Sequence, residues 1–333
     1  MATLVLNRDS LSVNLESNHL VIHDHAGGGG FQRVPLVDVE RVIVAGQPSI
    51  SFHVLAKLMD LGIPCSFLTH GGRWRGMMDG DGGFHAGRRI LQYERMRDGD
   101  FAVQFARQLA AAKIANCRRS LQRLAAERGM TLADDAGWRM LTALAGELPM
   151  AKSSDTVRGI EGVAANGYFK LLGLFFPKGA PFERRSRRPP LNPANALMSF
   201  AYTLLENEFT AAIRAHGLDV AGGFLHKGID RSPALALDLM EPFRPMLADR
   251  LTLNLLNHRR LLADRHFERV AEGGCHLTAD GRGIVFRAFD EMMARRVAVE
   301  CGRVTIRKVI DREVCRFIGM LEGREPMRFH RAA

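Results

Sequence analysis

The hydrophobic pattern of this 333-residue chain changes near residue 90, and that change limits the possible folds more than any other feature. Before it, short apolar runs alternate with polar residues, as in residues 11–15 and 19–23, and this alternation predicts the two strands of a hairpin. After it, apolar residues recur every three or four positions over long segments, which predicts amphipathic helices. The sequence therefore predicts an α+β fold.

We predict further strands at residues 41–44, 65–68 and 73–78 and a helix over 51–61. The four glycines at 27–30 precede neither a Lys-Ser/Thr pair nor a helix, so we interpret them as a hairpin loop. The glycine-rich residues 80–87 lead us to predict a small β-rich N-terminal domain over 1–88 and a larger all-α C-terminal domain over 89–333. The helices predicted in the second domain cover residues 101–128, 138–148, 157–175, 194–216, 238–262, 283–300 and 304–321.

The net charge of +10 lies entirely beyond residue 90, because residues 1–90 contain eight basic and eight acidic side chains. We therefore expect a polyanion such as nucleic acid to contact the helical part. The five cysteines are far apart and form no CxxC pair, which argues against a zinc ribbon or a disulfide framework. Because we find no signal peptide and no run of 18 apolar residues, we expect a soluble cytoplasmic protein without membrane contact.

Four side chains that can bind metal stand among apolar or glycine neighbours, where an uncompensated charge is costly: Glu161, His226, Asp238 and Glu241. Asp238 and Glu241 are three residues apart, so in a helix they share a face and repel each other unless a cation lies close by. Together these carboxylates and the imidazole can hold a divalent cation, and such a mixed donor set suits Mn²⁺ better than Mg²⁺. The alternative is a surface glutamate and a core histidine with separate structural roles, and spacing alone leaves both open.

Two glycines, Gly159 and Gly162, flank Glu161 in a segment predicted to be helical. Each weakens a helix by roughly 1 kcal/mol relative to alanine. Their presence leads us to expect that another group approaches the helix backbone closely at this point.

Four arginines occur together in a segment that two following prolines keep out of a helix: Arg184, Arg185, Arg187 and Arg188. Most charge runs are only solvated surfaces. Here the prolines stiffen the loop and reduce the entropy lost on ordering, so we predict that the four arginines bind DNA phosphates. The aromatic content of 7% is low for recognition by base stacking, which favours contacts to the DNA backbone.

Four ordered blocks between residues 158 and 245 resemble the CRISPR-associated spacer-acquisition integrases, the Cas1 (Cas-one) family. The blocks are Arg-Gly-Ile-Glu-Gly at 158–162, Arg-Arg-Pro-Pro-Leu-Asn-Pro-Ala-Asn-Ala-Leu-Met-Ser-Phe-Ala-Tyr at 187–202, Gly-Leu-Asp at 217–219 leading to Gly-Phe-Leu-His at 223–226, and Leu-Ala-Leu-Asp-Leu-Met-Glu-Pro-Phe-Arg-Pro at 235–245. The family has a β-rich N-terminal domain and a helical C-terminal domain, in agreement with the periodicity.

The resemblance implies that Glu161, His226 and Glu241 bind Mn²⁺ or Mg²⁺ and that Asp238 completes the catalytic group. Family members often have aspartate at the last position, and we expect the longer Glu241 to alter the geometry slightly without abolishing binding. The implied reaction is transesterification, in which a prespacer 3′-hydroxyl attacks a phosphodiester at the edge of the repeat array. Metal-dependent nicking of DNA, including branched DNA, is a related activity of the same site.

The implied partners are double-stranded DNA (prespacer and repeat array), a second copy of the chain bound through the N-terminal domain, and a small ferredoxin-like CRISPR adaptation protein. Two other functions remain open at this point. One is a branched-DNA repair nuclease that acts without integration and without a partner. The other is an architectural DNA-binding subunit whose metal site is vestigial.

Overall fold

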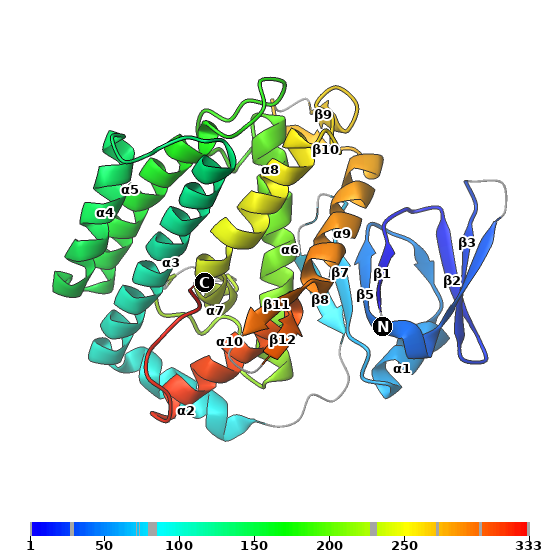
Figure 1. Ribbon diagram of the computed structural model, residues 1–333. Coiled ribbons are helices and arrows are strands. Elements are labelled where there is room, and N and C mark those ends of the chain that lie inside the picture. The colour runs from blue at the N-terminus through cyan, green and yellow to red at the C-terminus, as the bar shows by residue number, and fades with distance from the viewer. Residues whose placement is uncertain are drawn as a thin grey trace.

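The computed structural model describes residues 2–26, 30–70, 72, 74–78, 85–226, 232–270, 273–299 and 302–331. Figure 1 shows a β-rich part, drawn in blue, beside a larger group of helices. This arrangement confirms the predicted α+β fold with the strands first. Within the described residues, every helix is too short or too polar to cross a membrane. The division at residue 88 stays a prediction, and residues 80–84 of the glycine-rich segment on which it rests lie outside the described part.

The β-rich part contains two four-stranded sheets with a helix, α1 (Phe52–Asp60), beside them. Buried apolar side chains from both sheets and from α1 form one cluster, which includes Leu6, Leu20, Val42 and Leu58. The first sheet has the strand order β1-β5-β7-β8, with bounds Ala2–Leu6, Val39–Ala45, Cys65–Leu68 and Trp74–Met78. The second has the order β4-β3-β2-β6, with bounds Phe31–Pro35, His19–Asp24, Leu11–Glu16 and Ser49–Ile50.

The predicted hairpin is confirmed, since Leu11–Glu16 pairs antiparallel with His19–Asp24. The strands expected at 41–44, 65–68 and 73–78 and the helix at 51–61 are also present, within a few residues at each end. The sequence did not predict β1, β4 or the two-residue β6. Glycines 27–29 lie outside the described residues, and Gly30 precedes β4.

The helical part begins with α2, which the sequence did not predict, and the remaining helices follow in order. Several of them start at a side chain that accepts a hydrogen bond from a backbone N–H of the first turn, as Asp98, Ser153 and Asn192 do. The helices are α2 (Ala86–Arg97), α3 (Gly99–Glu127), α4 (Ala136–Glu147), α5 (Ser154–Gly173), α6 (Pro193–Ala215), α7 (Ala234–Met240), α8 (Arg250–Asn257), α9 (Ala279–Ala294) and α10 (Ile306–Leu321).

The prediction of one continuous helix over 238–262 was wrong. Helix α7 ends at Met240, a 3-10 turn covers Glu241–Phe243, and a π-helix covers Pro245–Asp249 before α8 begins. Pro242 and Pro245 cause the interruption, because each lacks a backbone N–H to continue the helical ladder. The result is an irregular turn that carries Glu241 and Asp249.

The helix predicted over 283–300 ends at Ala294, and two short hairpins were not predicted. Strands β11 (Arg296–Val299) and β12 (Gly302–Thr305) form one of them. Strands β9 (Phe267–Arg269) and β10 (Cys275–Leu277) form the other. Strands of three or four residues leave too little alternation for a sequence pattern to detect.

The segment after α10 folds back onto α3 (Figure 1). The Asn116 side chain on α3 donates hydrogen bonds to the carbonyl oxygens of Pro242 and His330, at 2.8 and 2.9 Å. The backbone N–H of His330 donates to Glu313 of α10 at 2.9 Å. Phe329 is buried and its ring lies edge-on to Phe105, with centroids 4.8 Å apart. The His330 ring also stacks on Phe243, with centroids 4.8 Å apart, so this segment packs directly against the turn that carries Glu241.

We expect Phe329→Ala to lower the free energy of unfolding by about 3 kcal/mol, because it opens a cavity among buried aromatic rings. Chemical denaturation monitored by circular dichroism would measure the change. Phe52→Ala, at a phenylalanine that is 74% exposed, is the matched control and should change stability by less than about 0.5 kcal/mol. Equal effects of the two substitutions would contradict the packing assigned to Phe329.

Candidate active site

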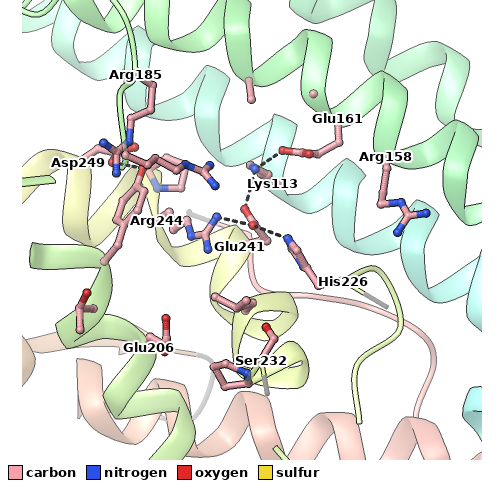
Figure 2. A pocket seen from close by; sticks show the side chains of 18 of the residues that line it. Lys113, Arg158, Glu161, Arg185, Glu206, His226, Ser232, Glu241, Arg244 and Asp249 are labelled. Carbon is pink, nitrogen blue, oxygen red and sulfur yellow. Dashed lines mark hydrogen bonds and ion pairs between the residues drawn. The ribbon is translucent and has the colours of Figure 1, made fainter. Parts of the chain in front are cut away.

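A cavity of about 1630 Å³ in the helical part contains most of the side chains predicted to be functional. Its walls come from α3, α5, α6 and the irregular turn after α7, which are far apart in sequence (Figure 2). Glu161, His226 and Glu241 all line it. The structure thus brings the three predicted metal ligands to one place.

Helix α5 presents Glu161 to this cavity. The flanking Gly159 and Gly162 line the cavity too, and a Cβ added to either would meet no atom within 4 Å. The expected close approach to the helix backbone is therefore not made by any described residue. The open space belongs to the cavity, where a bound molecule could approach the backbone.

The backbone leading to His226 is fixed by close packing. A Cβ on Gly223 would lie 2.6 Å from the Cβ of Ala234, and one on Gly222 would lie 2.3 Å from the side-chain nitrogen of Gln92. Only glycine allows α2 and α7 to approach the chain so closely at these two positions. Residues 227–231, which follow His226, lie outside the described residues.

Asp238 is completely buried and does not line the cavity. Its carboxylate accepts backbone hydrogen bonds from Phe224, Leu225 and His226 at 2.6, 3.0 and 3.0 Å. It also contacts Nδ1 of the His226 ring at 2.6 Å, which leaves Nε2 3.6 Å from Glu241 Oε1. Asp238 and Glu241 therefore flank the imidazole on opposite sides, and Asp238 orients the ring.

Lys113 of α3 lies between the two glutamates (Figure 2). Its ammonium contacts Glu161 Oε1 and lies 2.6 Å from Glu241 Oε2. Arg244 pairs with the other oxygen of Glu241. Sequence reasoning missed Lys113, although it is the single charged residue in the apolar, alanine-rich stretch 109–117 of a long helix.

The electrostatics of the site depend on these pairings. Burial alone would raise the pKa of Glu241, but the charges of Arg244, Lys113 and His226 outweigh it and lower that pKa to about 2. Burial lowers the pKa of His226, whereas the hydrogen bond with Asp238 and the charge of Glu241 raise it, with a net upward shift. The pKa of Lys113 is likewise raised, because attraction to Glu241 and Glu161 exceeds the effect of burial.

The four arginines of the predicted DNA-binding loop separate into different roles. Arg187 and Arg188 are exposed and line the cavity. Arg185 also lines it, but its guanidinium donates to Asn195 and Ser199, both at 2.9 Å, and so holds the loop on α6. Arg184 is exposed and lies outside the cavity lining.

A buried carboxyl group on the π-helix was also missed by sequence reasoning. Asp249 accepts hydrogen bonds from the hydroxyls of Tyr168 and Tyr202, at 2.8 and 2.7 Å. Burial raises its pKa to about 6 in spite of these bonds. The guanidiniums of Arg185 and Arg244 lie over the Tyr202 ring, 5.3 and 5.0 Å from its centroid. This group connects the arginine loop to the arginine that pairs with Glu241.

A separate cluster of His216, Asp311 and Cys315 has ligand atoms within 4.8 Å of one another. It lies where the end of α6 meets α10. Two cations already occupy its surroundings, since Lys308 pairs with Asp311 and Arg88 donates to the backbone oxygen of His216. Cations also pair with Glu241 in the cavity, where Lys113 and Arg244 contact its two oxygens, so neighbouring cations do not distinguish the two places. What the cavity offers is the carboxylates of Glu161 and Glu241 with the imidazole of His226, a donor set that suits a divalent ion.

Comparison with known proteins identifies the class of protein that this fold and site represent. A family model described as "CRISPR associated protein Cas1" matches residues 4–291. A Cas1 endonuclease from Rhodospirillum rubrum is 37% identical over 269 residues, which are 78% of this chain and 77% of the relative. The chain belongs to the Cas1 family. Its curated relatives are named as endonucleases.

The chain is also 34% identical over 287 residues to a Cas4 exonuclease/Cas1 endonuclease fusion from Geobacter sulfurreducens, covering 81% of this chain but only 49% of that protein. A solved Cas1 protein from Thermotoga maritima has a TM-score of 0.81 at 25% identity, with full coverage of both chains. Two structures at 22% identity share the fold: a casposase bound to integration product (TM-score 0.87, coverage 98% and 92%) and a Cas6-RT-Cas1–Cas2 complex (TM-score 0.80, coverage 99% and 36%).

Proposed function

We propose that this protein is a metal-dependent DNA integrase and endonuclease of CRISPR adaptation, which joins prespacer 3′-hydroxyl ends to the repeat array by transesterification in the cytoplasm. The convergence of Glu161, His226 and Glu241 on one cavity carries the proposal. Two carboxylates and an imidazole nitrogen suit Mn²⁺, and Mg²⁺ is the other candidate. Membership of the family and the likeness to a casposase bound to integration product support an integration reaction.

The residues that would hold the cation are Glu161, His226 and Glu241. A cation bound there would polarise the scissile phosphodiester and increase the acidity of the attacking hydroxyl. Asp238 holds the His226 ring in one orientation, with Nε2 toward Glu241. Arg244 neutralises part of the charge of Glu241, and Arg187 and Arg188 are placed to bind phosphates along the same cavity.

We further propose a homodimer formed through the β-rich part and assembly with a small ferredoxin-like partner. Exposed apolar side chains in that part, including Phe31 at 63% and Val37 at 79%, support a protein contact there. Phe31 lies on β4, an outer strand of its sheet, whose unpaired backbone groups can pair with a second chain. The likeness to a Cas1–Cas2 complex supports the second partner.

Strand transfer of a short duplex with free 3′-hydroxyls into a plasmid that carries the cognate repeat array tests the proposal. Reactions would contain Mn²⁺, Mg²⁺ or EDTA, with and without the small partner. We expect joining at the repeat edge that depends on the metal and is strongest with the partner. Cleavage of branched DNA without joining would support a repair nuclease instead. DNA binding without either reaction would support an architectural subunit.

We expect the double substitution Arg187→Ala and Arg188→Ala to weaken DNA binding and to reduce its dependence on salt. If each arginine contacts one phosphate of duplex DNA, the slope of log K against log salt should fall by about 1.8. Fluorescence anisotropy over a range of salt concentrations measures this slope. Arg119→Ala with Arg139→Ala, at two exposed arginines outside the cavity lining, is the matched control. An equal change in both double variants would refute the role of the loop.

A further inference from the structure

Lys113 is an unusual neighbour for two proposed metal ligands. Its side chain is only 12% exposed, and the side chains of Glu161 and Glu241 are 19% and 3% exposed. The ammonium contacts one oxygen of each glutamate, so a single positive charge lies between the two carboxylates. A metal that binds both of these oxygens would need the same position.

The charges around the cavity indicate that a divalent metal ion would replace the ammonium of Lys113. Glu161, Glu241 and the buried Asp238 carry three negative charges, and Lys113 and Arg244 carry two positive charges. With His226 neutral, as a metal ligand must be, a bound divalent ion would change the net charge of this group from −1 to +1. If the ammonium of Lys113 leaves, the net charge becomes zero. Charges on side chains that are shielded from water interact strongly with one another. The arrangement with a bound metal and a displaced Lys113, whose net charge is zero, is therefore favoured.

We propose that Lys113 is a built-in counter-ion that holds Glu161 and Glu241 together, and that a divalent cation enters by displacing its ammonium. The inference rests on the proposed metal role of these glutamates. Lys113 lines the cavity of about 1630 Å³, so its flexible side chain has open space into which the ammonium can move. There it faces the same space as Arg187 and Arg188 and adds a positive charge where DNA phosphates would enter.

Calorimetric titration with Mn²⁺ tests the competition directly. In Lys113→Met the two carboxylates lose their shared cation, so we expect Mn²⁺ affinity about 5- to 150-fold higher than in the wild type, the usual range for coupled binding events. The melting temperature in EDTA should fall, and its rise on adding Mn²⁺ should be larger than in the wild type. Lys170→Met, at an exposed lysine on the same helix as Glu161, is the matched control and should titrate like the wild type.

A second measurement uses the wild-type protein and so does not depend on the folding of a variant. Brief labelling with acetic anhydride, followed by mass spectrometry, reports the access of reagent to each lysine. We expect labelling of Lys113 to increase on addition of Mn²⁺ and labelling of Lys170 to stay constant. Unchanged labelling of Lys113 at saturating Mn²⁺, or equal affinity in folded Lys113→Met, overturns the proposal.

The failure of the proposed metal site would give a different result. If the wild type binds no Mn²⁺ at the cavity, its calorimetric titration will be the same as that of Glu161→Gln. That result would contradict the proposed role of Glu161 and Glu241 as metal ligands. If Glu161→Gln removes binding but Lys113→Met does not strengthen it, the metal site stands and only the displacement of Lys113 is wrong.

Discussion

Glu161→Gln should reduce metal-dependent strand transfer by about 10³-fold or more while leaving the fold and DNA binding intact. The amide is nearly isosteric with the carboxylate but lacks the charge that would hold a divalent ion, and several kcal/mol of transition-state stabilisation depend on that ion. Quantifying joined product on denaturing gels over time gives the rate. Circular dichroism and anisotropy at the same protein concentrations confirm folding and binding.

The matched control for this substitution is Glu147→Gln, which makes the same chemical change at an exposed position at the end of α4. It should retain the wild-type rate. Strand transfer by Glu161→Gln within a few-fold of the wild type would exclude Glu161 as a ligand of the catalytic ion.

Asp238→Asn should have a large effect of a different kind, because Asp238 does not line the cavity. The asparagine side chain has one acceptor oxygen where the carboxylate has two, and its amide would face backbone N–H groups that are themselves donors. Each buried donor left without a partner costs about 1–3 kcal/mol. The His226 ring also loses its orienting contact, and such losses reduce metal affinity or activity by about 10–100-fold.

Two measurements separate these consequences for Asp238→Asn: chemical denaturation in EDTA for stability, and Mn²⁺ titration for affinity. We expect both to be weakened, whereas Glu161→Gln should weaken the affinity alone. Asp264→Asn, at an exposed aspartate, is the control and should change neither. An Asp238→Asn variant with wild-type stability and affinity would show that His226 is positioned by other contacts.

Much of this fold could be predicted from the sequence because its signals are local. The helical periodicity of α3, α5 and α6 and the alternation in the first hairpin act over a few residues. The irregular turn after α7 could not be predicted from periodicity, since apolar residues continue at helical spacing through Pro242 and Pro245. The helix is interrupted there because Pro242 and Pro245 have no backbone N–H to donate, and the spacing of apolar residues carries no information about that.

The candidate site could likewise be predicted from the sequence only in part. Glu161 and His226 were identified as candidates because they are metal-binding residue types with glycines close by in the sequence. The resemblance to the Cas1 family then implied that both bind the same metal ion. The contact of Lys113 with both glutamates depends on the packing of α3 against α5 and the irregular turn, and no short pattern in the sequence records it. The separation of Arg187 and Arg188 from Arg184 likewise follows from how the loop is held on α6.

The double hydrogen bond made by Asn116 has a consequence for how the protein matures on the ribosome. Asn116 holds Pro242 and His330 together, and these two residues are 88 positions apart. At a synthesis rate of about 5–20 residues per second, residue 330 is added roughly 4–18 s after residue 242. A nascent chain thus carries every proposed metal ligand before the turn bearing Glu241 receives its final support. The hydrogen-bonded link between Pro242 and His330 through Asn116 therefore forms only after residue 330 has been synthesised.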